Sequence, residues 1–153
     1  MLFRSHFLLD DELDERADDQ PTRTYLWDVR NLSAPVHFAT YVAPTSAVDH
    51  NQFVVGRLSF QANYHAGLRI LDLRDIRRGE LSELGFFDVS PHSDTNEKFG
   101  GAWGVYPFLP SRNVLVSAID RGLYVLGPSA AIRQLARPRS GSASGSAPTD
   151  ASE

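Results

Sequence analysis

The chain has 153 residues, 42% of them hydrophobic, which fits one globular domain and argues against two. A net charge of -4 without a basic stripe argues against nucleic acid as a partner. The absence of cysteine excludes disulfides and thiolate metal sites, and no apolar run approaches the roughly 20 residues that span a bilayer.

We do not expect the N-terminal stretch MLFRSHFLLDDELDE to be a signal peptide, because acidic residues follow Phe7, Leu8 and Leu9 at once. Short β-branched and aromatic runs, separated by Gly, Pro, Asn and Asp, then continue to about Leu126 and predict an all-β domain. The expected strands are 7–9, 22–29, 36–42, 52–55, 58–63, 68–73, 81–88, 102–108, 113–118 and 122–126. We expect essentially no helix before Pro128.

The C-terminal part has a different composition. Residues 128–136 predict a short helix or turn with Ser129 as its N-cap. Residues 137–153 lack large apolar side chains and predict a disordered low-complexity tail.

The strand pattern repeats along the chain. Leu26-Trp27-Asp28-Val29 matches Ile70-Leu71-Asp72-Leu73, with an offset of 44 residues between the two aspartates, and Gly67 matches Gly122 with an offset of 55. Units of this length with four short strands are typical of propeller blades. Residues 1–127 therefore predict a partial β-propeller of about three antiparallel blades, with the first lacking its initial strand and the last its final strand.

Several segments carry a family resemblance. TYLWDVRNLSAPV, DHN, FQANYHAGLRILDL, LGFFD, GAWGVYPF and DRGLYVL resemble the C-terminal part of choice-of-anchor B family proteins, which contain LVIVD-type repeats. The resemblance covers roughly Leu8 to Leu126 and implies a β-propeller in an exported or surface-attached protein, without established chemistry. Because the N-terminal repeats of that family are not in this sequence, we expect the missing blades, or self-association through edge strands, to complete the fold.

In a propeller, the connections between blades and those between the second and third strands of each blade lie on one face. This topology brings together a set of candidate ligand-binding residues, namely Asp49, His50, Asn51, Tyr64, His65, Asp120 and Arg121. Two simpler interpretations stay open: His50 locks a neighbouring blade by a hydrogen bond, and Tyr64 and His65 form an ordinary exposed turn. Trp103, which lies among glycines, is expected to pack in the core.

Acidic residues also suggest a metal site. Asp10, Glu12 and Asp14 alternate along the chain and could supply oxygen ligands to calcium or another divalent cation. The segment lacks the glycine and the distal glutamate of an EF-hand, so a solvated acidic loop is the alternative.

Two functions remain possible. The first is a non-enzymatic module that binds a protein, glycan or small ligand through the loops of one face, with no cofactor required. The second is a metal-assisted hydrolase or lyase that uses carboxylates and His50 at the propeller centre. The sequence contains no G-x-S-x-G motif, so nothing supports nucleophilic catalysis. It favours the non-enzymatic binding module.

Overall fold

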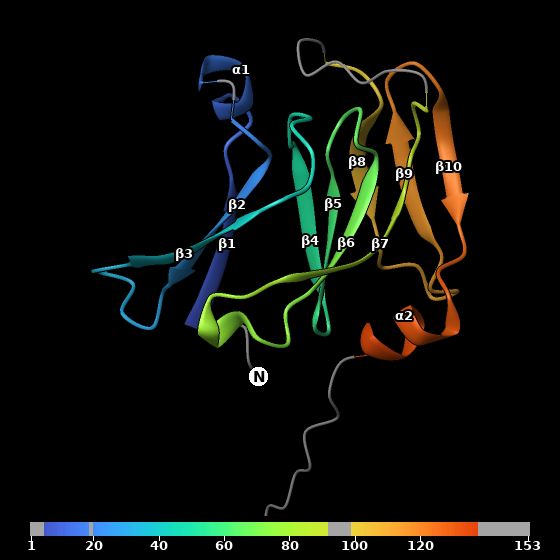
Figure 1. Ribbon diagram of the computed structural model, residues 1–153. Coiled ribbons are helices and arrows are strands. Elements are labelled where there is room, and N and C mark those ends of the chain that lie inside the picture. Colours follow the sequence, from blue (N-terminus) through green and yellow to red (C-terminus); the bar gives the residue numbers. More distant parts are fainter. Residues whose placement is uncertain (1–4, 19, 92–98, 138–153) are drawn as a thin grey trace, which may run out of the picture.

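The computed structural model describes residues 5–18, 20–91 and 99–137. These residues form three antiparallel sheets, which follow one another along the chain and stack side by side (Figure 1). The all-β class predicted from the sequence is therefore confirmed. None of the three sheets closes on itself in the described part of the chain.

All ten predicted strands are present. The first sheet contains β1 (His6–Asp10), β2 (Arg23–Asp28) and β3 (Val36–Val42). The second contains β4 (Asn51–Val55), β5 (Leu58–Ala62), β6 (Leu68–Asp72) and β7 (Ser82–Phe87). The third contains β8 (Ala102–Tyr106), β9 (Val114–Ala118) and β10 (Gly122–Leu126).

The expectation of essentially no helix before Pro128 needs correction. Helix α1 (Asp14–Asp18) lies in the connection between β1 and β2, and the 3₁₀ helix η2 (Ile76–Arg78) lies between β6 and β7. Asp14 and Glu15 occupy the first turn of α1, a position where acidic residues are common. One turn is too short to produce a detectable helical period in the sequence.

Helix α2 (Ala130–Leu135) forms where the sequence predicts a short helix or turn. The hydroxyl of Ser129 accepts a hydrogen bond from the Ile132 amide at 3.3 Å and caps the helix as expected. Ile132 and Leu135 then pack against the core formed by the second and third sheets. Except for Arg137, the segment predicted to be a disordered tail lies outside the described residues.

The second sheet lies between the other two, and all five residues of its strand β5 are buried. Alternate residues of this strand face opposite sides. Leu58, Phe60 and Ala62 join an apolar core shared with β8 and β9 of the third sheet. Ser59 and Gln61 are buried on the other side, where Gln61 donates a hydrogen bond to the hydroxyl of Thr24 in β2 at 2.8 Å.

The contact between the first and second sheets has only a small apolar core. It consists of Leu26, Leu73 and Ile76, with partly buried neighbours from β1, β3 and Leu81. The three sheets thus meet through one apolar interface and one interface rich in buried polar groups.

The connections 11–22, 43–50, 63–67 and 119–121 emerge at the upper end of the sheets in Figure 1, where α1 lies. We call this the α1 end. The connections 56–57, 73–81 and 107–113 emerge at the opposite end.

Candidate functional site

The turn at Tyr64 connects the second and third sheets at the α1 end. Its backbone has φ of +35°, a left-handed conformation that is unfavourable for a residue with a side chain. Two backbone hydrogen bonds with Ala102, at 3.0 and 2.8 Å, join this turn of the second sheet to β8 of the third. Such strain is maintained only where surrounding contacts enforce it, and it concentrates at functional sites.

Four rings form a group around this turn, which we call the aromatic cluster: His50, Tyr64, Phe99 and Trp103. The ring centre of Tyr64 lies 5.3 Å from that of His50, 5.0 Å from that of Phe99 and 6.1 Å from that of Trp103. His50 and Trp103 are closer still, at 4.3 Å. Trp103 is 49% exposed, so the expectation that it packs in the core is wrong.

A carboxylate lies beside the aromatic cluster. The hydroxyl of Tyr64 donates a hydrogen bond to Oε1 of Glu12 at 2.5 Å, and Nε2 of His50 lies 4.0 Å from the same oxygen. His50 uses its other ring nitrogen, Nδ1, to donate to the carbonyl of Trp103. Burial, followed by the bond to Glu12, raises the pKa of Tyr64 and keeps its hydroxyl protonated as a donor.

Four further acidic side chains lie between the first sheet and the start of β4; we call them the carboxyl cluster: Asp10, Asp14, Glu15 and Asp49. Asp10 ends β1, Asp14 and Glu15 begin α1, and Asp49 precedes β4. Asp49 is 1% exposed, and its carboxyl group has no hydrogen-bond partner among the described residues. Glu15 is 2% exposed, and its carboxyl group interacts with the side chain of Asp14.

Two members of the carboxyl cluster are oriented by neighbouring polar groups. Asp10 accepts hydrogen bonds from the side chains of Thr24 and Gln52. The hydroxyl of Tyr25 donates to Oδ2 of Asp14 at 2.6 Å. In both aspartates the remaining oxygen, Oδ1, is buried without a partner among the described residues.

Burial makes ionisation of these groups unfavourable. Burial, with a smaller contribution from the neighbouring carboxylates, raises the pKa of Asp10 to about 7, of Glu15 to about 8 and of Asp49 to about 9. Each ionisation therefore favours the unfolded state, in which the carboxyl groups are solvated and far apart.

The structure divides the predicted ligand-binding residues. His50 and Tyr64 meet in the aromatic cluster, whereas Asp49 belongs to the carboxyl cluster. Oδ1 of Asn51 accepts a hydrogen bond from the Val105 amide at 3.3 Å, which links β4 to β8.

The remaining predicted residues lie at the edge of the same end. The ring of His65 packs beside Gly100, and both of its nitrogens are buried without a partner among the described residues. Asp120 accepts a hydrogen bond from the Gly101 amide at 3.1 Å, which is the main reason that its pKa is lowered, and it also pairs with the exposed Arg121 at 3.3 Å.

The predicted metal ligands do not form one set. Asp10 and Asp14 belong to the carboxyl cluster, but Glu12 turns to Tyr64 and His50. In the described ranges, no three acidic or histidine side chains are already arranged to hold a metal ion. Glu15 was missed because α1 was not predicted.

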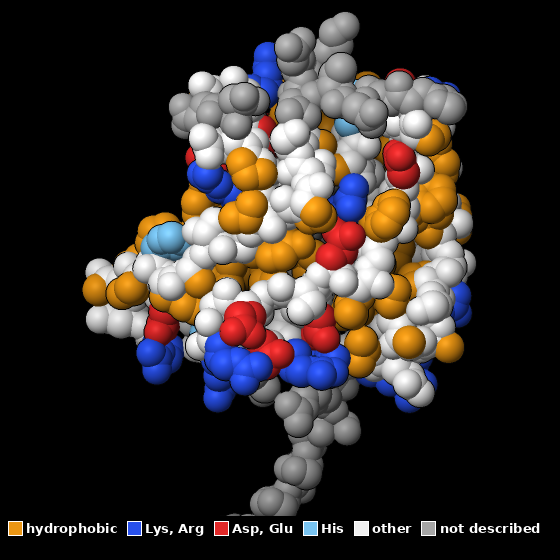
Figure 2. All heavy atoms as spheres, viewed as in Figure 1, with side chains coloured by type: hydrophobic (Ala, Val, Ile, Leu, Met, Phe, Trp, Pro, Cys, Tyr) orange, Lys and Arg blue, Asp and Glu red, His pale blue; other side chains and the backbone are white. Residues whose placement is uncertain are grey.

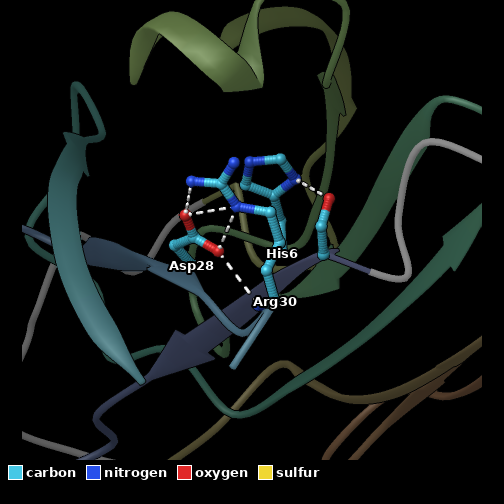
Figure 3. A network of polar contacts seen from close by, with 4 residues as sticks. His6, Asp28 and Arg30 are labelled. Atoms are coloured by element: carbon cyan, nitrogen blue, oxygen red, sulfur yellow. Dashed lines mark hydrogen bonds and ion pairs between the residues drawn. The ribbon is translucent and has the colours of Figure 1, made fainter. Parts of the chain in front are cut away.

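A separate hollow of about 450 Å³ lies at the opposite end, lined by residues that include His6, Phe38 and Arg77. Figure 3 shows polar side chains that line this hollow. The guanidinium of Arg30 donates hydrogen bonds of 2.5 to 3.0 Å to the carboxylate of Asp28. Hydrogen bonds from Arg30 lower the pKa of Asp28 to about 2. The charge of Arg30 is thus already neutralised, and the α1 end remains the better candidate site.

Comparison with protein-family models, with curated proteins and with solved structures finds no significant match. Among the described residues, no helix is long and apolar enough to cross a membrane.

Proposed function

We propose that the chain is a three-blade part of a β-propeller and acts as a non-enzymatic binding module. The observation that carries the binding proposal is the half-exposed Trp103 next to His50, Tyr64 and the Glu12 carboxylate. The resemblance to choice-of-anchor B proteins supports the propeller and suggests an exported or surface-attached location.

The free faces of the outer sheets also support a propeller. Phe7 and Leu9 of β1 are exposed on the side of the first sheet that faces away from the second. Leu123 and Val125 of β10 are exposed on the equivalent side of the third sheet, and Figure 2 shows apolar side chains along that side of the molecule. Apolar faces of this kind pack against further blades in a ring.

The ligand class follows from the charge and the rings of the α1 end. Electron-rich ring faces attract cations, and a carboxylate beside them strengthens that preference. The guanidinium of Arg16 lies 4.6 Å from the ring centre of Phe99, and this contact of a cation with one ring of the cluster supports the proposal. The ligand is therefore a peptide segment that presents arginine or lysine side chains.

Tryptophan fluorescence tests the binding. The chain has two tryptophans, so Trp27→Phe leaves Trp103 as the only reporter. At 150 mM salt, we expect its emission to change saturably with an arginine-rich hexapeptide and not with a glutamate-rich hexapeptide or a neutral hexasaccharide. Adding Glu12→Gln should weaken peptide binding by about two- to fivefold, because it removes the adjacent negative charge.

Glu80→Gln is the matched control, because it removes one acidic charge beside η2 at the opposite end. It should leave the affinity unchanged. Equal responses to the basic and acidic peptides, or equal effects of Glu12→Gln and Glu80→Gln, would contradict a specific cation-binding surface.

The free apolar faces lead to an expectation for the isolated chain. A second copy should cover them, so sedimentation velocity should show faster-sedimenting species as the concentration rises. The double substitution Leu123→Lys, Val125→Lys should weaken this association at least tenfold, because it places charge on an apolar face. A chain that sediments as a monomer at every concentration would contradict the proposal that these faces bind further blades.

A further inference from the structure

The hollow at the end opposite α1 lies between the first sheet and the connection that follows β6. We call it the η2 hollow; it has a volume of about 450 Å³ and is lined by Ser5, His6, Asp28, Arg30, Phe38 and Arg77. This volume falls within the range of roughly 300–1,000 Å³ that is typical of small-molecule pockets. Figure 3 shows the side chains of His6 and Arg30 pointing from the end of the first sheet toward η2.

The packing of η2 fixes its position beside the η2 hollow. Ile76, the first residue of η2, is fully buried in the small apolar core between the first and second sheets. Gly79 approaches β3 so closely that a β-carbon there would lie 2.6 Å from the β-carbon of Ala39. The backbone of Arg77 is therefore held against the first sheet, and its side chain lines the hollow.

Arg77 carries a positive charge without an acidic partner among the described residues. The adjacent Arg78 pairs with Asp75 at 2.7 Å and with Glu80 at 3.7 Å, but none of the ion pairs in this part of the chain involves Arg77. The lining of the hollow contains two guanidinium groups and one carboxylate, that of Asp28. It therefore has an excess of positive charge.

The second guanidinium, that of Arg30, is already oriented. Arg30 donates to Asp28 through Nε and Nη2, and its Nη1 has no hydrogen-bond partner among the residues that the structure describes. The ion pair cancels the net charge of Arg30, but it also restricts the side chain. A ligand that accepts a hydrogen bond from Nη1 therefore has less side-chain entropy to overcome.

A third donor and an apolar wall complete the lining. The hydroxyl of Ser5 lies 3.1 Å from Nδ1 of His6, so Nε2 of that ring can carry the hydrogen and donate to a ligand. The ring of Phe38 is 37% exposed, and its centre lies 5.6 Å from that of His6. The hollow thus combines donors for an anion with a surface for a flat apolar group.

We propose that the η2 hollow binds a small phosphate monoester, with the phosphate held by Arg77, Arg30 and His6 and the apolar group placed against Phe38. Guanidinium groups bind the oxygens of phosphate and carboxylate through paired hydrogen bonds. A phosphate is favoured because it has three acceptor oxygens and a charge of about −1.5 to −2 at pH 7, whereas a carboxylate carries a single charge. The site is separate from the aromatic cluster, and the proposal does not depend on peptide binding there.

Isothermal titration calorimetry of the full chain with phenyl phosphate tests the proposal. We expect saturable binding of about one molecule per chain. Inorganic phosphate, which lacks the ring, and benzoate, which presents a carboxylate, should each bind about threefold more weakly or worse. Phenol, which has no anionic group at pH 7, should give no measurable binding.

Two adjacent arginines provide matched variants. Arg77→Gln should weaken phenyl phosphate binding by about three- to tenfold, because it removes a charge-assisted hydrogen bond. Arg77→Lys keeps the charge and should retain part of the affinity. Arg78→Gln removes the same charge one residue away, from a side chain that is not part of the lining, and should leave the affinity unchanged. Arg77 is exposed, so neither of its variants should lower the melting temperature.

Phe38→Ala separates the two parts of the ligand. It should weaken the binding of phenyl phosphate about threefold and leave that of inorganic phosphate unchanged. Equal effects on the two ligands would contradict the placement of the apolar group against Phe38.

The proposal is overturned if phenyl phosphate does not bind saturably, or if benzoate binds as tightly as phenyl phosphate. It is also overturned if Arg77→Gln and Arg78→Gln weaken binding equally. Loss of peptide binding in these variants has no bearing on it, since the aromatic cluster uses other residues.

Discussion

Replacing Gly67 by alanine is expected to lower the free energy of unfolding by about 3 kcal/mol or more. Gly67 has φ of +72°, which costs an L-residue roughly 1–2 kcal/mol. A β-carbon there would also lie 2.1 Å from the carbonyl oxygen of Phe87 and 3.1 Å from the α-carbon of Asp88. Because both are backbone atoms of the neighbouring strand and its end, they cannot move aside without breaking the pairing of β6 with β7.

Gly122 offers a matched control for this substitution. Its φ is +80°, and no atom lies within 4 Å of the place where a β-carbon would be. Gly122→Ala should therefore cost only the backbone strain of roughly 1–2 kcal/mol. Urea unfolding of both variants measures the difference, and equal losses would contradict the close approach of β7 to the turn at Gly67.

Truncating Phe60 to alanine is expected to destabilise the protein by about 3–5 kcal/mol, because it empties part of a close-packed core. Phe60 is 2% exposed and lies in β5, within the apolar core that joins the second and third sheets. A loss of this size is a large share of the 5–15 kcal/mol that typically stabilises a domain.

Phe86 is the control for the Phe60 substitution. It lies in β7, is 62% exposed and contacts the guanidinium of Arg69 at 4.7 Å. Phe86→Ala should change the free energy of unfolding by about 1 kcal/mol or less. If urea unfolding showed similar losses for both variants, the apolar core would not lie where the structure places it.

The sequence predicts the strands well because every one of them carries a local signal. Segments such as Leu58 to Ala62 are bounded by turn residues, and each pairs with its neighbour in the chain, so no long-range information is needed. The repeat between Asp28 and Asp72 also predicts that similar units follow one another. How the sheets stand relative to one another is not contained in either signal.

The candidate site is harder to predict, because it depends on which way side chains turn. The three consecutive residues of DHN make different contacts. Asp49 belongs to the carboxyl cluster, His50 belongs to the aromatic cluster, and Asn51 accepts a hydrogen bond from the backbone of β8. The topology alone gathers these residues at one end. Alternating side-chain directions would place Asp49 and Asn51 on the same side, so their separation depends on the backbone just before β4 and on the packing of the sheets, which the sequence does not specify.

The order of the strands also affects how the chain folds. Every strand pairing in the described ranges joins strands that are adjacent in the sequence, so only short loops must close. Local pairing of this kind favours fast folding for an all-β protein, since little loop entropy is lost before contacts form. During synthesis the first sheet can form early, but the face that packs against the second sheet remains exposed to solvent until the second sheet has formed. The chain therefore gains most of its burial late, when β5 is enclosed on both sides.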